Sequence, residues 1–218
     1  IAQSAIAGEG VIGNGGGTWV CREQNKSIGW IQLVDLFEAE NEFQLTIARY
    51  PGSVREIFDS VQMRLFQVNK DLLEMITKYL DQINYLEEKA NKVVYTEDEL
   101  QMIDDSLYRL KPGLKRCLSG SLAYEQAVNY KVDGQILVQR ELTGALSNTE
   151  KAALALHEAV YAYRREAAGD KDSVISRKIV GLLFSTLSAQ DLKSELEKLG
   201  ESELPPSPMA FVKILPGT

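Results

Sequence analysis

The feature that most constrains the fold is a long apolar stripe in the first half of the chain. From Phe58 to Tyr79, apolar side chains recur in steps that alternate between three and four residues. This spacing places them on one face of an α-helix and is typical of helices that pack nearly parallel to one another. An apolar face of this length must be covered by other apolar side chains. The stripe consists of Phe58, Val61, Leu65, Val68, Leu72, Met75 and Tyr79.

The stripe lies in a segment, residues 53–91, that the sequence predicts as one long helix. Ser53 follows Pro51-Gly52 and is a suitable N-cap. At about 1.5 Å per residue the helix would be roughly 55–60 Å long, which exceeds the diameter of a compact domain. We therefore expect it either to break or to project as a helical arm. A projecting arm could cover its stripe by homodimerisation through the 53–91 helix.

A second, shorter helix is the other candidate to cover the stripe. The sequence Thr96-Glu-Asp-Glu99 is a capping box, and it predicts a helix from Asp98 to Leu110 that ends before Pro112-Gly113. Residues 53–110 would then form a long helical segment.

Two β-hairpins are predicted, one on each side of this segment. In the first, Thr18–Arg22 and Ile28–Phe37 are rich in β-forming residues, and Asn25-Lys-Ser27 is typical of a turn. In the second, near residues 122–139, Asp133-Gly134 separates two β-prone stretches and is a strong hairpin signal. The two hairpins would form a small antiparallel sheet.

Three further helices are predicted, over residues 147–168, 173–187 and 188–199. The first opens with the capping box Ser147-Asn-Thr-Glu150, and Gly169 stands where a glycine commonly ends a helix. The order of hairpins and helices predicts an α+β fold, with a mainly helical single domain.

We expect the single domain to span residues 1–218. The glycine-rich segment 1–17 is expected to be an arm against the domain, because no helix follows its glycines to complete a phosphate-binding loop. Residues 114–199 would hold the sheet and the core helices. Residues 200–218 contain several prolines and should form an extended tail.

Charge and hydropathy exclude two classes of partner. The net charge is −7, and the basic residues are interspersed with acids, so no basic stripe is available to follow a nucleic acid backbone. No apolar run approaches the roughly 18–20 residues of a membrane-spanning helix. The sequence therefore predicts a protein that binds no nucleic acid and does not span a membrane.

The chain contains two cysteines, Cys21 and Cys117. A disulfide between them would close a loop of about 100 residues and stabilise the fold by up to ~4.7 kcal/mol. The alternative is a pair of unbonded, buried thiols.

The one histidine of the chain, His157, lies in the sequence Leu156-His-Glu-Ala-Val-Tyr161. A zinc peptidase helix reads His-Glu-x-x-His, because two imidazoles one turn apart bind one zinc ion while the glutamate activates its water. Tyr161 occupies the position of the second imidazole. The sequence therefore predicts neither this metal centre nor any other cofactor.

The same helix supplies four candidate catalytic residues. His157, Tyr161 and Arg164 fall on one face, and Glu158 lies about 100° around the axis. His157 and Glu158 would serve as general acid and base, while Tyr161 or Arg164 would stabilise developing charge. Alternatively, His157 is a buried structural residue bonded to a carbonyl or carboxylate, or it binds a metal together with carboxylates or a second chain.

Other catalytic arrangements are less well supported. The chain has no Gly-x-Ser-x-Gly motif, and Cys117 could act as a nucleophile with His157 only if it were unpaired. Two carboxylates could perform glycosidase chemistry. Glu125, Glu141 and Glu158 lie near the predicted sheet and helix, but the sequence does not select a pair.

Six short motifs occur along the chain outside the long helix: Gly13-Asn-Gly-Gly16, Cys21-Arg22, Leu33-Val-Asp-Leu-Phe-Glu-Ala39, Leu156-His-Glu-Ala-Val-Tyr161, Asp172-Ser173 and Leu182-Leu-Phe-Ser185. Together they resemble a family of secreted bacterial proteins that carry a signal peptide and have no established activity. This resemblance implies export to the periplasm or beyond, and it favours the disulfide. Ile136–Gln139, followed by the His-Glu helix, is also similar to the edge strand and active helix of zincin peptidases.

Two functions follow as hypotheses. The first is a secreted or periplasmic protein with a degenerate zincin-like core that is non-catalytic and binds a protein or a cell-envelope component. The alternative is a hydrolase of peptide or cell-wall substrates that uses His157 and Glu158.

Overall fold

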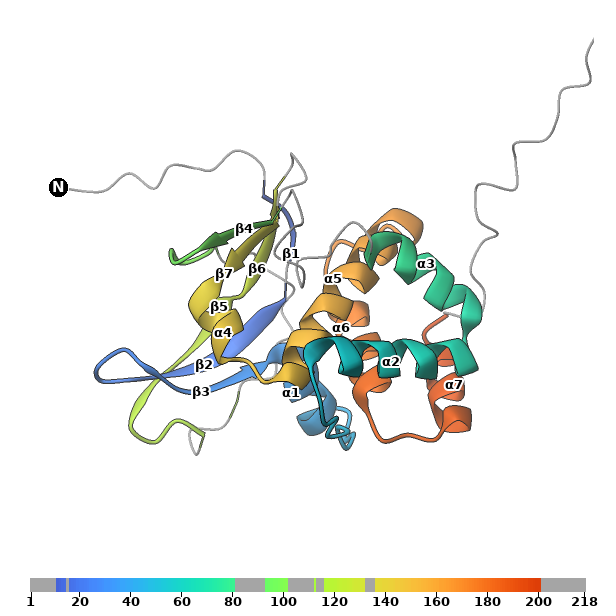
Figure 1. Cartoon of the computed structure of the whole chain (residues 1–218), viewed down its shortest axis with the longest axis horizontal. Helices are drawn as coiled ribbons and strands as arrows, with labels where there is room; N and C mark the ends of the chain where they lie inside the picture. The colour runs from blue at the N-terminus through green and yellow to red at the C-terminus, as the bar shows by residue number, and fades with distance from the viewer. Residues whose placement is uncertain are drawn as a thin grey trace, which may run out of the picture.

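The computed structural model describes residues 11–14, 16–80, 93–101, 112, 116–131 and 136–200. Strands gather at one side of the molecule together with α4, and the other helices lie at the opposite side, which confirms the α+β prediction (Figure 1). The strands are β1 (Val11–Asn14), β2 (Gly17–Glu23), β3 (Ile28–Leu33), β4 (Val93–Thr96), β5 (Gly120–Gln126), β6 (Val128–Lys131) and β7 (Ile136–Gln139). The helices are α1 (Val34–Asn41), α2 (Val54–Val68), α3 (Lys70–Leu80), α4 (Arg140–Ala145), α5 (Asn148–Ala167), α6 (Val174–Phe184) and α7 (Ala189–Lys198). Among these helices, none has the length and apolarity needed to cross a lipid bilayer.

The strands form two sheets rather than the single sheet that was predicted. One is antiparallel, in the order β3-β2-β5; the other has the order β1-β6-β7-β4, in which β4 is parallel to β7. The first predicted hairpin is confirmed, with Thr18 of β2 opposite Leu33 of β3. In the second, β6 and β7 are antiparallel, with Val128 opposite Val138. Its predicted turn, Asp133-Gly134, lies outside the described residues.

The Cys21–Cys117 disulfide is present, and it joins residues 96 positions apart in the sequence. The bond lies beside the pairing of β2 with β5, in which Cys21 is opposite Leu122. It therefore fastens the N-terminal strands to the strand that follows Cys117, and the alternative of two unbonded thiols is wrong.

Helix α1 was not predicted. The segment Ile28–Phe37 was expected to be extended throughout, but the strand ends at Leu33 and a helix begins at Val34. Tertiary packing explains the difference, because α1 lies against α6 with little space between the two backbones. A Cβ atom added to Gly181 of α6 would be 2.7 Å from the Cβ of Ala39.

The predicted long helix is broken into α2 and α3. The two helices meet at Asn69, whose backbone is non-helical with φ −154° and ψ 88°. Its side chain also caps α3, since Asn69 Oδ1 accepts a hydrogen bond of 2.9 Å from the amide of Leu72. A continuous helix or projecting arm is therefore wrong for residues 53–80; residues 81–92 are not described.

The apolar stripe is covered within the chain. Side chains of α2 and α3 enter the same buried cluster as α5. This removes the basis on which homodimerisation was predicted, because the stripe needs no second copy. The buried stripe residues are Phe58, Val61, Leu65, Leu72 and Tyr79.

The predicted helix from Asp98 to Leu110 does not begin where expected. Thr96 ends strand β4, and residues 97–101 are not helical. The Thr96 hydroxyl accepts a hydrogen bond from the amide of Asp98 and closes a local turn. Residues 102–110 lie outside the described part of the chain.

The three C-terminal helices match the prediction closely. The Ser147–Glu150 capping box is formed at the start of α5, and Gly169 has the positive φ of 73° that favours glycine after a helix end. Helix α6 ends at Phe184, three residues earlier than expected, and Ser188 caps α7.

Arg64 of α2 explains the early end of α6. Its guanidinium donates hydrogen bonds of 2.5–2.6 Å to the carbonyl oxygens of Leu183, Ser185 and Leu187. At and just beyond the end of a helix, backbone carbonyl groups have no helical amide to accept from. Here the guanidinium of Arg64 donates to them instead. Arg64 therefore holds α2 against the α6–α7 connection.

Candidate functional site

His157 lies inside the molecule, on the central helix α5. Its side chain is 1% exposed, and Nδ1 is 2.6 Å from Oδ1 of Asp35, which is fully buried on α1. An ionised carboxylate has only acceptor atoms, so we assign the proton to Nδ1, which donates it to Asp35. The contact fixes the orientation of the ring.

A buried ion pair lies one helical turn along α1 from Asp35. Arg177 of α6 donates from Nε to Oε2 of Glu38 at 2.7 Å, and both side chains are 4% exposed. Arg177 also donates to the hydroxyl of Ser173 at 2.9 Å. We name Asp35, Glu38, His157 and Arg177 the buried ionic cluster; it joins α1, α5 and α6.

Burial raises the pKa of Glu38 to about 7. Desolvation of the carboxylate is the main cause; the nearby charge of Arg177 opposes the increase, and the charge of Asp35 adds to it. Within the described part of the chain, Glu38 Oε1 and Asp35 Oδ2 accept no hydrogen bond. Burial therefore favours the protonated form of Glu38.

Glu158 contacts a different part of the fold from His157. Its Oε1 accepts a hydrogen bond of 2.5 Å from the backbone amide of Gly16, and the residue has no exposed surface. A Cβ atom on Gly16 would be 2.0 Å from Cδ1 of Leu154, so the backbone approaches α5 as closely as only glycine permits. Glu158 therefore anchors the connection between β1 and β2.

Of the other two candidates, Tyr161 lies beside His157, whereas Arg164 does not. The centroids of the Tyr161 ring and the His157 imidazole are 6.2 Å apart. The guanidinium of Arg165 lies 5.6 Å from the centroid of the Tyr161 ring. Arg164 instead forms an ion pair with Asp170 at 2.8 Å, beyond the end of α5. The four candidates therefore do not converge on one space.

The remaining proposed chemistries meet structural obstacles. Cys117 is in the disulfide, so it is not a nucleophile for His157. Glu125 and Glu141 both bind the guanidinium of Arg22, at 2.7 Å and 2.9 Å. The pairing lowers the pKa of Glu141 and fastens α4 to β2 and β5.

One strand does not match the resemblance to zincin peptidases. Ile136–Gln139 was compared with an edge strand, but it forms β7, which lies between β6 and β4 inside its sheet. Among the described residues, no group of three or more histidine, cysteine, aspartate and glutamate side chains is placed to hold a metal ion.

The sequence pointed to His157 but not to the three other residues of the buried ionic cluster. Asp35 and Glu38 are two acids one helical turn apart inside an apolar run, and Arg177 interrupts the apolar segment of α6. A charge at such a position signals a buried pair. The signal was hidden because α1 was expected to be a strand.

Comparison of the chain with protein-family models, with curated protein sequences and with solved structures found no match in any of the three. The function proposed below therefore depends on the geometry of this chain.

Proposed function

We propose that the protein is a non-catalytic, secreted or periplasmic protein that binds a cell-envelope component, with the His-Glu helix as its structural centre. The observation that carries this proposal is the burial of His157 in a hydrogen bond with Asp35. A general acid or base must come within hydrogen-bond distance of the substrate. His157 is 1% exposed and Glu158 is fully buried, so a substrate could reach them only if packed helices separated.

Export is supported by the disulfide. Disulfides form and persist in oxidising compartments such as the periplasm and the extracellular space. The Cys21–Cys117 bond fits such a compartment, and the resemblance to secreted bacterial proteins points the same way.

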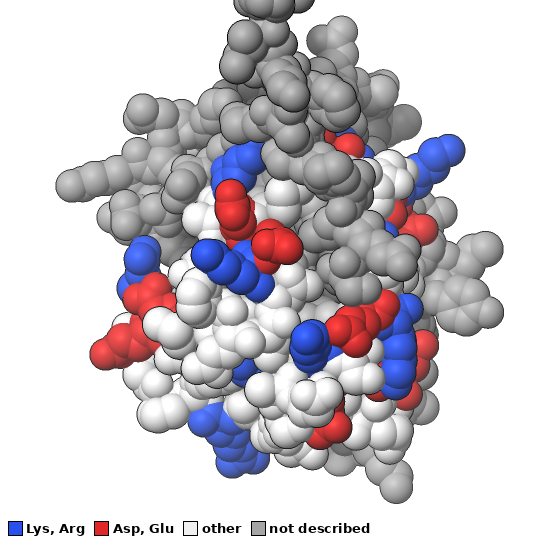
Figure 2. Space-filling model, turned by 90° about the vertical axis from the view of Figure 1, so that its right-hand side faces the viewer, with Lys and Arg blue, Asp and Glu red and all other residues white. Residues whose placement is uncertain are grey.

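Binding is supported by the character of the surface. Figure 2 shows positive and negative side chains interspersed over one face, with uncharged surface between them. A mixed surface of this kind suits a specific partner better than a polyanion. Among the described residues, four large apolar side chains are exposed to solvent: Met63, Phe66, Val94 and Leu118.

The proposal is tested with purified peptidoglycan and casein as substrates, and with peptidoglycan as a sedimentable ligand. Wild type and Glu158→Gln should release no product from either substrate. Both should pellet with peptidoglycan, because the surface is the same in the two proteins. Failure of wild type to pellet would reject cell-wall binding, and product formed by wild type but not by Glu158→Gln would reject the non-catalytic role.

A hydrolase remains the second candidate, and one observation favours it. The contact of a carboxylate with Nδ1 of an imidazole is the arrangement that orients the general base in many hydrolases. Asp35 and His157 have this contact, at 2.6 Å. If this candidate is correct, His157→Gln should abolish product formation from casein or peptidoglycan while the circular dichroism spectrum stays native.

A further inference from the structure

The turn between β2 and β3 carries a modification motif. Asn25-Lys-Ser27 is the one place in the sequence where serine or threonine stands two positions after an asparagine, with a residue other than proline between them. This tripeptide is the acceptor sequence for N-linked glycans, and in an exported protein it marks a surface loop. Because the motif is short, its surroundings must decide whether it is an acceptor.

The motif is accessible in the folded protein. All three of its residues are exposed, and they lie at the tip of the hairpin that extends away from the helices, at the left of Figure 1. The tip is also held in one shape. The amide of Glu23 donates to the carbonyl of Ser27, and the carbonyl of Lys26 accepts from the guanidinium of Arg22 at 3.0 Å. An enzyme can therefore reach Asn25 without separating the strands.

Within the turn, Ser27 contacts the side chain of Asn25. The Oδ1 atom of Asn25 accepts hydrogen bonds from the amide of Ser27 at 3.0 Å and from its hydroxyl at 2.7 Å. Among the described contacts, Nδ2 of Asn25 donates no hydrogen bond, so the nitrogen that would carry a glycan is available. The two residues that define the motif are thus in direct contact.

The shape of the turn does not by itself account for this tripeptide. Lys26 has a φ of 68°, in the left-handed region that glycine and asparagine favour over other residues. A turn formed for its shape alone would place one of these two at that position, whereas here the asparagine precedes it. The order of the three residues fits the modification motif better than it fits the turn.

We propose that Asn25 is the acceptor of an N-linked glycan, which is transferred from an oligosaccharide bound to a polyprenyl pyrophosphate. Nδ2 of Asn25 attacks the anomeric carbon of the first sugar, and the bond from this carbon to the pyrophosphate oxygen breaks. The polyprenyl pyrophosphate leaves with the bonding electrons, and Nδ2 gives up one proton. The proposal rests on export, which is part of the proposed function. The disulfide of Cys21, in the strand that leads to the turn, fits the same route.

The experiment incubates the folded, oxidised full chain with a purified bacterial oligosaccharyltransferase and its polyprenyl-linked oligosaccharide. Wild type should gain the mass of one oligosaccharide, and peptide mass spectrometry should locate it on Asn25. Ser27→Ala keeps the asparagine but removes the hydroxyl, so it should lose the modification. Ser27→Thr restores a hydroxyl and should be modified like wild type. Thermal melting followed by circular dichroism checks that both variants are folded, which is expected because Ser27 is exposed.

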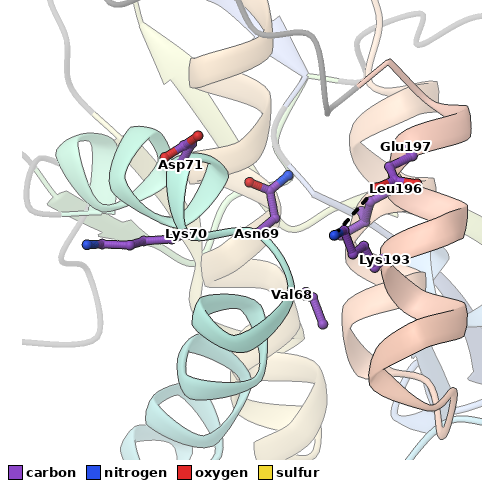
Figure 3. A pocket seen from close by; sticks show the side chains of 7 residues that line it. All are labelled: Val68, Asn69, Lys70, Asp71, Lys193, Leu196 and Glu197. Atoms are coloured by element: carbon purple, nitrogen blue, oxygen red, sulfur yellow. Dashed lines mark ion pairs between the residues drawn. The ribbon is translucent and has the colours of Figure 1, made fainter.

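Asn69 is the internal control, because it is also followed by lysine but then by Asp71 in place of a hydroxyl residue. It lies at the break between α2 and α3, on the wall of a groove of about 240 Å³ with α7 opposite (Figure 3). Its Oδ1 accepts from the amide of Leu72 within the same turn of chain. Asn69 should stay unmodified in the same reaction.

Three results would overturn the proposal: wild type that gains no mass while an acceptor peptide is modified in parallel, Ser27→Ala modified as fully as wild type, or a glycan on Asn69. The reaction uses purified protein, so its outcome does not depend on whether the chain pellets with peptidoglycan. A failure of this proposal and a failure of the proposed function are therefore distinguishable.

Discussion

Asp35 and His157 lie in the core and contact each other, with Nδ1 of the imidazole 2.6 Å from Oδ1 of the carboxylate. They lie 122 positions apart in the sequence, and their side chains are 0% and 1% exposed. Removing one partner of a buried ion pair costs about 3–5 kcal/mol, whereas replacing both by apolar groups is often nearly neutral. The sequence could locate His157 but not this pairing, since it depends on how α1 packs.

The structural role of this pair is testable by a double-mutant cycle. Asp35→Leu and His157→Leu should each lower the free energy of unfolding by about 3–5 kcal/mol, because each leaves a buried polar partner. The double variant should be more stable than either single variant. Urea denaturation measures all four proteins, and losses that simply add would contradict a coupled pair.

Glu38 should make stability depend on pH. Its pKa is raised from 4.5 to about 7 in the fold, so its stabilising contribution is fully present below pH 4.5 and is lost as the pH rises through 7. This difference between the pKa of Glu38 in the unfolded and the folded chain corresponds to roughly 3 kcal/mol of free energy of unfolding. We expect the stability of wild type relative to Glu38→Gln to fall over this range, as measured by urea denaturation at pH 5 and pH 8. A relative stability that rises with pH would show that the charge of Arg177 outweighs desolvation.

At the scale of elements, the sequence predicted helices where local signals act and failed where packing decides. The capping box Ser147–Glu150 and Gly169 fixed the ends of α5, because both act within a few residues. The break at Asn69 could be expected but not located, since the apolar stripe continues across it and no glycine or proline marks the position. The ends of α1 depend on α6, which is distant in sequence and close in space.

The close packing of α1 and α6 gives a prediction at this scale. Gly181→Ala should lower the free energy of unfolding by about 1–3 kcal/mol, because the new methyl group would be 2.7 Å from the Cβ of Ala39. Adding Ala39→Gly should restore part of the loss. Gly144→Ala on α4 is the control, since no atom lies within 4 Å of its new Cβ, and it should be neutral or stabilising by up to about 1 kcal/mol. Thermal melts that rank the two alanine variants equally would argue against the packing account.

At the scale of the molecule, the α+β class followed from the order of elements, but the arrangement of strands did not. Two sheets arise because β5 and β6 are almost continuous yet pair with different neighbours, on either side of Ala127. The amide of Ala127 bonds to the carbonyl of Gly16, and its carbonyl accepts from the amide of Gln139. No local pattern shows that a strand changes sheets. The disulfide then fastens the two distant halves of the first sheet.

The disulfide should therefore contribute to global stability. Closing a loop of 96 residues limits the unfolded chain, which corresponds to as much as ~4.7 kcal/mol. The double variant Cys21→Ala/Cys117→Ala should unfold at a lower urea concentration than oxidised wild type. Reduced wild type should behave like the double variant. Equal midpoints for oxidised and reduced wild type would indicate that the bond does not constrain the unfolded state.

The central claim is that His157 is part of the core and does not meet a substrate. It is the one histidine of the chain, so its reaction with diethyl pyrocarbonate reports on this imidazole without interference from another. We expect the native protein to resist modification of His157 and the urea-unfolded protein to react at the rate of free imidazole. Modification of the native protein at that same rate would contradict a buried His157 and favour an open active site.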